Sequence, residues 1–217
     1  MVAGTGQKLG IPESLHDGYR RFRSGRYAQE VDRYRALAQG QQPRTMVIGC
    51  VDSRVDPATI FSASPGELLV VRNVAALVPP YEEVGTYHGT SAALEFAVCV
   101  LKVSNIVILG HGMCGGIAAS LTVKERGPVG RFIDLWVGLL ADVRDAVVEQ
   151  TALESDRQKA LEQAAVRQSL ENLTSFSFVS EALAEGRLTL YGAWFSIAEG
   201  ELLWLNNETD EFDLVPE

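Results

Sequence analysis

Three short, continuous apolar runs constrain the fold of this chain more than any other feature. They occupy residues 45–50, 67–72 and 105–110, and none of them alternates apolar with polar residues. A strand that is buried on both faces of a parallel sheet has this pattern, whereas a half-exposed strand alternates. A helical pattern at 90–101 separates the second run from the third. This order predicts an α/β fold with a central, mostly parallel β-sheet flanked by helices.

Helical patterns also lie outside these three runs. The first, over residues 1–40, predicts an N-terminal helical arm with a break at Gly25. Two apolar runs around 198–201 predict a C-terminal hairpin at the sheet edge, and an acidic tail follows at 208–217. No repeat or linker divides the sequence, so we predict a single domain over 1–217. The other predicted helices cover 131–151, 154–173 and 175–185.

The composition excludes several classes of protein. With 47% hydrophobic and 22% charged residues, the chain has the composition of a globular protein rather than a disordered one. Its net charge of −9 opposes binding to nucleic acid or to an anionic membrane surface. The longest apolar run, 96–101, is far shorter than the roughly 20 residues of a membrane helix. No secretory signal is visible, and we expect a cytoplasmic protein without nucleic-acid or membrane partners.

Polar clusters follow the first and the third apolar run. Cys50-Val-Asp-Ser-Arg54 follows the first, and His111-Gly-Met-Cys114 follows the third. Open α/β sheets place their ligands at the carboxyl ends of adjacent strands, so we expect Cys50, His111 and Cys114 to lie together. Two thiolates and an imidazole suit Zn²⁺. Three protein ligands leave one coordination position open, as in a catalytic zinc site.

Each of these residues alone has a simpler interpretation. A single cysteine is more often a small buried apolar side chain than a ligand. A single histidine more often occupies a core or capping position. Their joint occurrence at two strand ends favours the metal site. The third cysteine, Cys99, lies within an apolar helical pattern and is interpreted as structural. Three cysteines cannot form a disulfide framework, and they fit a reducing compartment.

Asp52 and Arg54 follow Cys50 at alternate positions. The three side chains point to one side if the chain stays extended. Two roles are open for the carboxylate. It can fill the open coordination position, or it can pair with Arg54 and accept a hydrogen bond from metal-bound water. Guanidinium and carboxylate match as a bidentate pair, and such a pair would keep Asp52 off the metal.

The two polar clusters and the segments around them resemble the β-class carbonic anhydrases. The segments around PPY and SLENL resemble the plant-like branch of that family in particular. The similarity is close from Gln41 to about Gly116 and looser through 166–179 and 190–205. The segments that carry it most clearly are GQQPRTMVIGCVDSRVDPATIF, PGELLVVRNVAALVPPY, GTSAALEFAV and KVSNIVILGHGMCGG.

The resemblance implies a carbonate dehydratase, a lyase of carbon utilisation that converts CO2 reversibly to bicarbonate and a proton by zinc-bound hydroxide. It implies one Zn²⁺ per chain, bound by Cys50, His111 and Cys114. Family members are homodimers or multiples of dimers whose N-terminal helices embrace the partner. The other site residues that it implies are a catalytic dyad of Asp52 and Arg54, and substrate contacts from Gln41, Leu69, Val74, Phe96 and the backbone N–H of Gly115.

The sequence departs from the family pattern at a few positions. Ala76 replaces the usual Asn, which removes a polar side chain beside the site. Val47 replaces the Trp of members with a regulatory bicarbonate site, and Tyr191 replaces a common His. Two alternative functions remain open: hydrolysis of a linear CO2 analogue such as carbon disulfide, and non-catalytic zinc binding. The sequence has no Cys-x-x-Cys, which argues against a thiol-redox protein.

Overall fold

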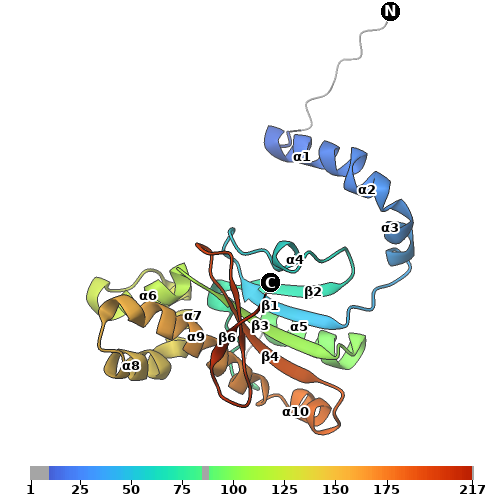
Figure 1. Ribbon diagram of the computed structural model, residues 1–217. Helices are drawn as coiled ribbons and strands as arrows, with labels where there is room; N and C mark the ends of the chain where they lie inside the picture. Colours follow the sequence, from blue (N-terminus) through green and yellow to red (C-terminus); the bar gives the residue numbers. More distant parts are fainter. Residues whose placement is uncertain (1–9, 85–87, 217) are drawn as a thin grey trace, which may run out of the picture. The chain divides into compact units, whose positions relative to one another are not determined.

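The chain is described by a computed structural model, which covers residues 10–84 and 88–216 (Figure 1). Residues 1–9 of the predicted arm and residue 217 of the predicted tail lie outside the described residues. The chain divides into two compact units, Met1–Gln41 and Gln42–Glu217. The assignment of both units to a single domain stays a prediction.

The described part of the N-terminal unit is helical. Its helices are α1 (Glu13–Ser24), α2 (Arg26–Gln29) and α3 (Val31–Leu37). Aromatic rings from different helices pack on one another: the Phe22 and Tyr34 rings are 5.7 Å apart, and the Tyr27 and Tyr34 rings 5.0 Å apart. The break between α1 and α2 falls at Gly25, as the sequence predicts.

The larger unit contains a six-stranded sheet in the order β2-β1-β3-β4-β5-β6. The first four strands in this order are parallel and lie side by side in Figure 1, and the last two are added antiparallel. This arrangement confirms the predicted mostly parallel sheet with a hairpin at its edge. The strands are β1 (Thr45–Cys50), β2 (Leu68–Asn73), β3 (Asn105–His111), β4 (Thr189–Phe195), β5 (Leu202–Leu205) and β6 (Phe212–Leu214).

The four helices predicted for this unit are present, whereas the helices at Pro57–Ile60 and Gly115–Arg126 were not predicted. The helix predicted over 131–151 is divided by a 3₁₀ turn at Gly138–Leu140. None of the described helices combines the length and the apolar character needed to cross a bilayer. The helical elements are α4 (Pro57–Ile60), η1 (Val74–Ala76), α5 (Gly89–Glu95), η2 (Phe96–Leu101), α6 (Gly115–Arg126), α7 (Arg131–Val137), η3 (Gly138–Leu140), α8 (Ala141–Gln150), α9 (Glu154–Leu173) and α10 (Ser177–Ala184).

The two central strands explain the continuous apolar runs. In β1 and in β3 every residue after the first is buried. Met46 and Ile48 of β1 belong to one apolar cluster, whereas Val47 belongs to another. The two strands are in parallel register, with Gly49 opposite Leu109. Their carboxyl ends therefore meet at one edge of the sheet, where the polar clusters begin.

Candidate metal centre

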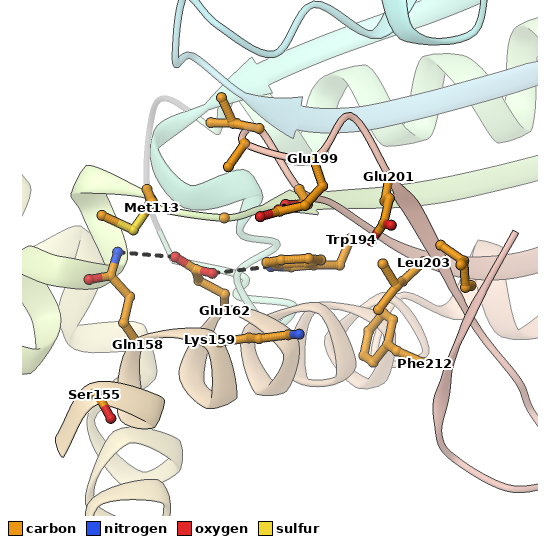
Figure 2. A pocket seen from close by; sticks show the side chains of 15 residues that line it. Met113, Ser155, Gln158, Lys159, Glu162, Trp194, Glu199, Glu201, Leu203 and Phe212 are labelled. Atoms are coloured by element: carbon orange, nitrogen blue, oxygen red, sulfur yellow. Dashed lines mark hydrogen bonds between the residues drawn. The ribbon is translucent and has the colours of Figure 1, made fainter. Parts of the chain in front are cut away.

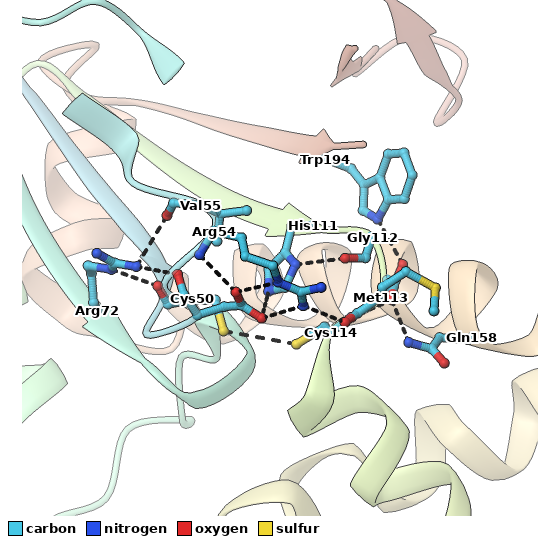
Figure 3. Close-up of polar contacts among 12 residues, drawn as sticks. Cys50, Arg54, Val55, Arg72, His111, Gly112, Met113, Cys114, Gln158 and Trp194 are labelled. Carbon is cyan, nitrogen blue, oxygen red and sulfur yellow. Dashed lines mark hydrogen bonds and ion pairs between the residues drawn. The ribbon is translucent and has the colours of Figure 1, made fainter. Parts of the chain in front are cut away.

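The three predicted ligands meet at the carboxyl ends of β1 and β3 (Figure 3). Cys50 is the last residue of β1, His111 is the last residue of β3, and Cys114 caps the N-terminus of α6. All three side chains are buried. The two sulfurs are 4.0 Å apart, and one ligand atom from each residue lies within 4.8 Å of the others. The structure thus brings together the residues that the sequence singled out.

The imidazole of His111 is prepared to act as a ligand. Its Nδ1 lies 2.9 Å from the carbonyl oxygen of Gly112. This contact assigns the proton to Nδ1 and leaves a lone pair on Nε2. Nε2 is buried and has no hydrogen-bond partner within residues 10–84 and 88–216. Because a buried polar atom without a partner is costly, and because two sulfurs and an imidazole suit Zn²⁺, the residues present fit that metal.

The two thiols influence each other strongly. The hydrogen bond with Cys114 holds the pKa of Cys50 well below its usual range, and the same contact, together with burial, raises the pKa of Cys114. Burial opposes the charged form of His111, but contacts with Cys50, the Gly112 carbonyl and Asp52 outweigh it and raise the pKa of the imidazole. Cys114 and His111 therefore retain protons that a metal must displace, so a higher pH favours metal binding.

Asp52 and Arg54 form a bidentate ion pair next to this cluster. Arg54 Nη2 donates to Asp52 Oδ2 at 2.7 Å, and Arg54 Nε donates to Oδ1 at 2.9 Å. These hydrogen bonds hold the pKa of the Asp52 carboxyl well below its usual range. Arg54 Nη2 also donates to the carbonyl of Met113 at 3.0 Å, and Asp52 Oδ2 lies 4.0 Å from Nε2 of His111. The structure shows the predicted pairing of Asp52 with Arg54, and the role of Asp52 toward a bound metal stays a prediction.

Arg72 and Asn73 at the end of β2 support the site, and sequence reasoning did not assign them to it. Arg72 donates to the carbonyls of Cys50 at 2.7 Å and Asp52 at 2.6 Å, which fixes the loop after β1. Asn73 Nδ2 donates to the carbonyl of Leu77 at 2.7 Å, and its Oδ1 accepts the N–H of the same residue at 2.9 Å. The signal in the sequence is a cation and an amide at the carboxyl end of an apolar run, as for the assigned residues.

The predicted substrate contacts lie in different surroundings. Val74 packs against the apolar cluster that contains Cys50 and Cys114. Leu69 packs against a separate cluster, and Phe96 is 42% exposed. Gly115 is an exposed residue at the start of α6, and Gln41 belongs to the N-terminal unit. The roles of these five residues in substrate binding stay predictions.

Gly116 shows how closely η1 and α6 approach each other. A Cβ atom there would lie 2.6 Å from Cγ1 of Val74, whereas a Cβ at Gly115 would meet no atom within 4 Å. We expect Gly116→Ala to lower the free energy of unfolding by about 1–3 kcal/mol through overpacking. The matched variant Gly115→Ala should leave it unchanged or raise it, because alanine favours a helix. Urea denaturation of both variants measures the difference, and equal stabilities would contradict this reading of the interface.

Ala76, the residue that departs from the resemblance described above, ends the 3₁₀ turn η1. Ala76 is buried and has a positive φ of 56°, a region in which Asn is several-fold enriched over other residues with a side chain. Asn is also the residue that the family usually has here. Alanine thus occupies a left-handed backbone conformation at position 76 without the preference that Asn has for it.

The fold and the site together define an α/β protein with a buried Cys–His–Cys group that could hold a metal ion at the carboxyl edge of its parallel strands. The family model described as carbonic anhydrase matches residues 45–202 of this sequence. The chain belongs to the carbonic anhydrase family, and its relatives and structural neighbours place it in the β class.

The chain is 36% identical over 180 residues to beta carbonic anhydrase 5, chloroplastic, of Arabidopsis thaliana. That match covers 82% of this chain but only 59% of the relative, so the chain spans less than two thirds of the relative's length. Among solved structures, the β-carbonic anhydrase CcaA is similar with a TM-score of 0.86 and 30% identity, covering 93% of this chain and 98% of the other. A tetrameric β-carbonic anhydrase of Sordaria macrospora is similar with a TM-score of 0.80 and 32% identity. That match covers 89% of this chain and 95% of the other.

Proposed function

We propose that this chain is a zinc-dependent carbonic anhydrase that converts CO2 reversibly to bicarbonate and a proton. The buried Cys–His–Cys cluster carries the proposal, since it occurs on a scaffold that the chain shares with β-carbonic anhydrases. Cys50, His111 and Cys114 would hold the Zn²⁺. When bound, the metal supplies an activated water as nucleophile, less acidic than the water of three-histidine carbonic anhydrases (pKa about 7) because two ligands here are anionic.

The residues around the cluster orient the reaction. Asp52 is ionised at every working pH, since its ordinary pKa already lies far below neutral and Arg54 lowers it further, so its Oδ2 remains a hydrogen-bond acceptor near His111 Nε2. Arg54 holds this carboxylate by two hydrogen bonds and so keeps it from turning toward the metal ligands. Val74 supplies apolar contact at the site. A small neutral substrate needs no electrostatic steering, which is compatible with the net charge of −9.

We expect CO2 hydration to increase from acidic to alkaline pH. The nucleophile must lose a proton whose pKa lies above 7, and Asp52 is not the group that titrates, because its pKa lies far below that range. The rate should rise about tenfold or more between roughly pH 6.5 and pH 8.5, as for one essential base. Stopped-flow measurement of CO2 hydration, with zinc content determined on the same sample, tests this. A flat profile would contradict the mechanism, and zinc-loaded protein without activity would contradict the function.

The assembly and location of the chain are part of the same proposal. The Sordaria macrospora neighbour is tetrameric, which supports a homodimer or a multiple of dimers for this chain. The Arabidopsis relative is chloroplastic, and the cytoplasmic location stays a prediction.

A further inference from the structure

A buried carboxylate touches the metal-binding loop from a different helix. Glu162 of α9 is 3% exposed and lines a cavity of about 540 Å³ (Figure 2). Its Oε1 accepts the backbone N–H of Cys114 at 3.0 Å and a hydrogen bond from Gln158 Nε2 at 3.1 Å. Its Oε2 accepts the indole N–H of Trp194 at 3.1 Å. Three donors from three elements of the chain thus converge on one side chain that the proposed reaction does not use.

The backbone of Cys114 needs this partner. Cys114 is buried and precedes the first residue of α6, so its N–H lies outside the hydrogen-bond ladder of the helix. A buried N–H without an acceptor is destabilising, and an apolar residue at position 162 could not supply one. Burial of the Glu162 carboxyl is itself unfavourable and raises its pKa. Packing alone would therefore favour an apolar residue here, whereas contact with Cys114 requires an acceptor.

The loop that leads to Cys114 also requires a tether. Met113 has a positive φ of 56°, which is uncommon for a residue with a side chain and persists where the surroundings fix it. Arg54 holds this loop at the carbonyl of Met113, and Glu162 holds it one residue later at the amide of Cys114. The two contacts act on successive residues and come from segments that precede and follow the loop in the sequence.

We propose that Glu162 is a positioning residue for the metal ligand Cys114. By fixing the amide of Cys114, its carboxylate directs Sγ toward Cys50 and His111. This inference rests on the metal centre proposed above. Residues that hold a ligand in this way typically change metal affinity by about 10–100-fold when they are replaced. The carboxylate of Glu162 is itself held in place by hydrogen bonds from Trp194 and Gln158.

The test compares Glu162→Gln with Glu201→Gln. Glutamine has the shape of glutamate but only one acceptor oxygen, so it cannot serve the donors on both sides of the carboxylate. Glu201 lines the same cavity but is exposed, which makes its variant a matched control. Zinc affinity is measured by competition with a chelator, and the cobalt-substituted protein is examined for its thiolate-to-cobalt absorption band. We expect Glu162→Gln to weaken zinc binding about 10–100-fold and to alter the cobalt band, with Glu201→Gln unchanged.

The outcomes separate this inference from the proposed function. Wild-type protein that binds neither zinc nor cobalt overturns the metal centre and this inference with it. If the wild-type protein binds both metals and folded Glu162→Gln has the same zinc affinity and cobalt band, only the role of Glu162 is overturned. An equal loss of zinc affinity in Glu162→Gln and Glu201→Gln also overturns that role. If Glu162→Gln does not fold, Glu162→Asp decides by the same two measurements, because it retracts the carboxylate by one methylene: weakened zinc binding supports the role, and wild-type values overturn it.

Discussion

Replacing Cys50 by Ser is expected to abolish stoichiometric zinc binding and, with it, CO2 hydration. The thiol of Cys50 has a pKa held well below its usual range, which makes it a ready thiolate ligand. A serine hydroxyl stays protonated at neutral pH and is a harder donor than sulfur. We expect zinc affinity to fall by on the order of 100-fold or more, beyond the effect of losing a residue that merely supports a ligand. Zinc content after dialysis and stopped-flow rates measure the two effects.

Cys99→Ser is the matched control for this substitution. Cys99 is exposed and lies in η2, outside the cluster of potential ligands. The variant should keep its zinc and its activity, which would separate a ligand effect from a general effect of losing a thiol. A Cys50→Ser protein with full zinc content and full activity would show that Cys50 is not a ligand.

The strand positions could be predicted because a strand that is buried on both faces is continuously apolar in sequence. β1 and β3 are the innermost strands of the parallel part of the sheet, and their continuous apolar runs match their observed bounds closely. β6 could not be predicted in this way. It is only three residues long, Phe212–Leu214, lies within an acidic segment, and depends on pairing with β5.

The helix predicted over 131–151 shows a second limit of pattern reading. Phe132 and Leu135 are two of the apolar residues that give this segment its helical pattern, but they are 83% and 74% exposed in this chain. Periodicity reports that a face is apolar and does not report what covers it. The apolar pattern also does not indicate the turn at Gly138–Leu140 that divides the helix and buries Leu140.

The site could be predicted as far as its residues adjoin strand ends in the sequence. Cys50, Asp52 and Arg54 lie within five residues of chain, and a single strand pairing brings them to His111. Glu162 lies 48 residues from the amide that it contacts, so no local pattern connects the two. The one signal of its role in the sequence is that Glu162, next to Leu161, is a carboxylate on a face of α9 whose other buried residues are small or apolar.

Replacing Arg54 by Met is expected to lower CO2 hydration by about 100-fold while zinc remains bound. Methionine keeps much of the side chain's length but removes both hydrogen bonds to Asp52 and the one to the carbonyl of Met113. The pKa of Asp52 would then rise toward its ordinary value of about 3.9, so the carboxylate would still be ionised at neutral pH. The substitution therefore changes where this charge is held rather than whether it is present.

A released Asp52 has a short path to the metal ligands, because its Oδ2 already lies 4.0 Å from Nε2 of His111. If it turns toward the metal, it blocks the open coordination position, and the loss of activity should depend on the carboxylate itself. Asp52→Asn in the Arg54→Met background should then cost little further activity, although Asp52→Asn alone lowers it. Stopped-flow rates and zinc content of the two single variants and the double variant measure this coupling. Additive losses would mean that the two residues act independently, and loss of zinc from Arg54→Met would mean that the ion pair stabilises the cluster instead.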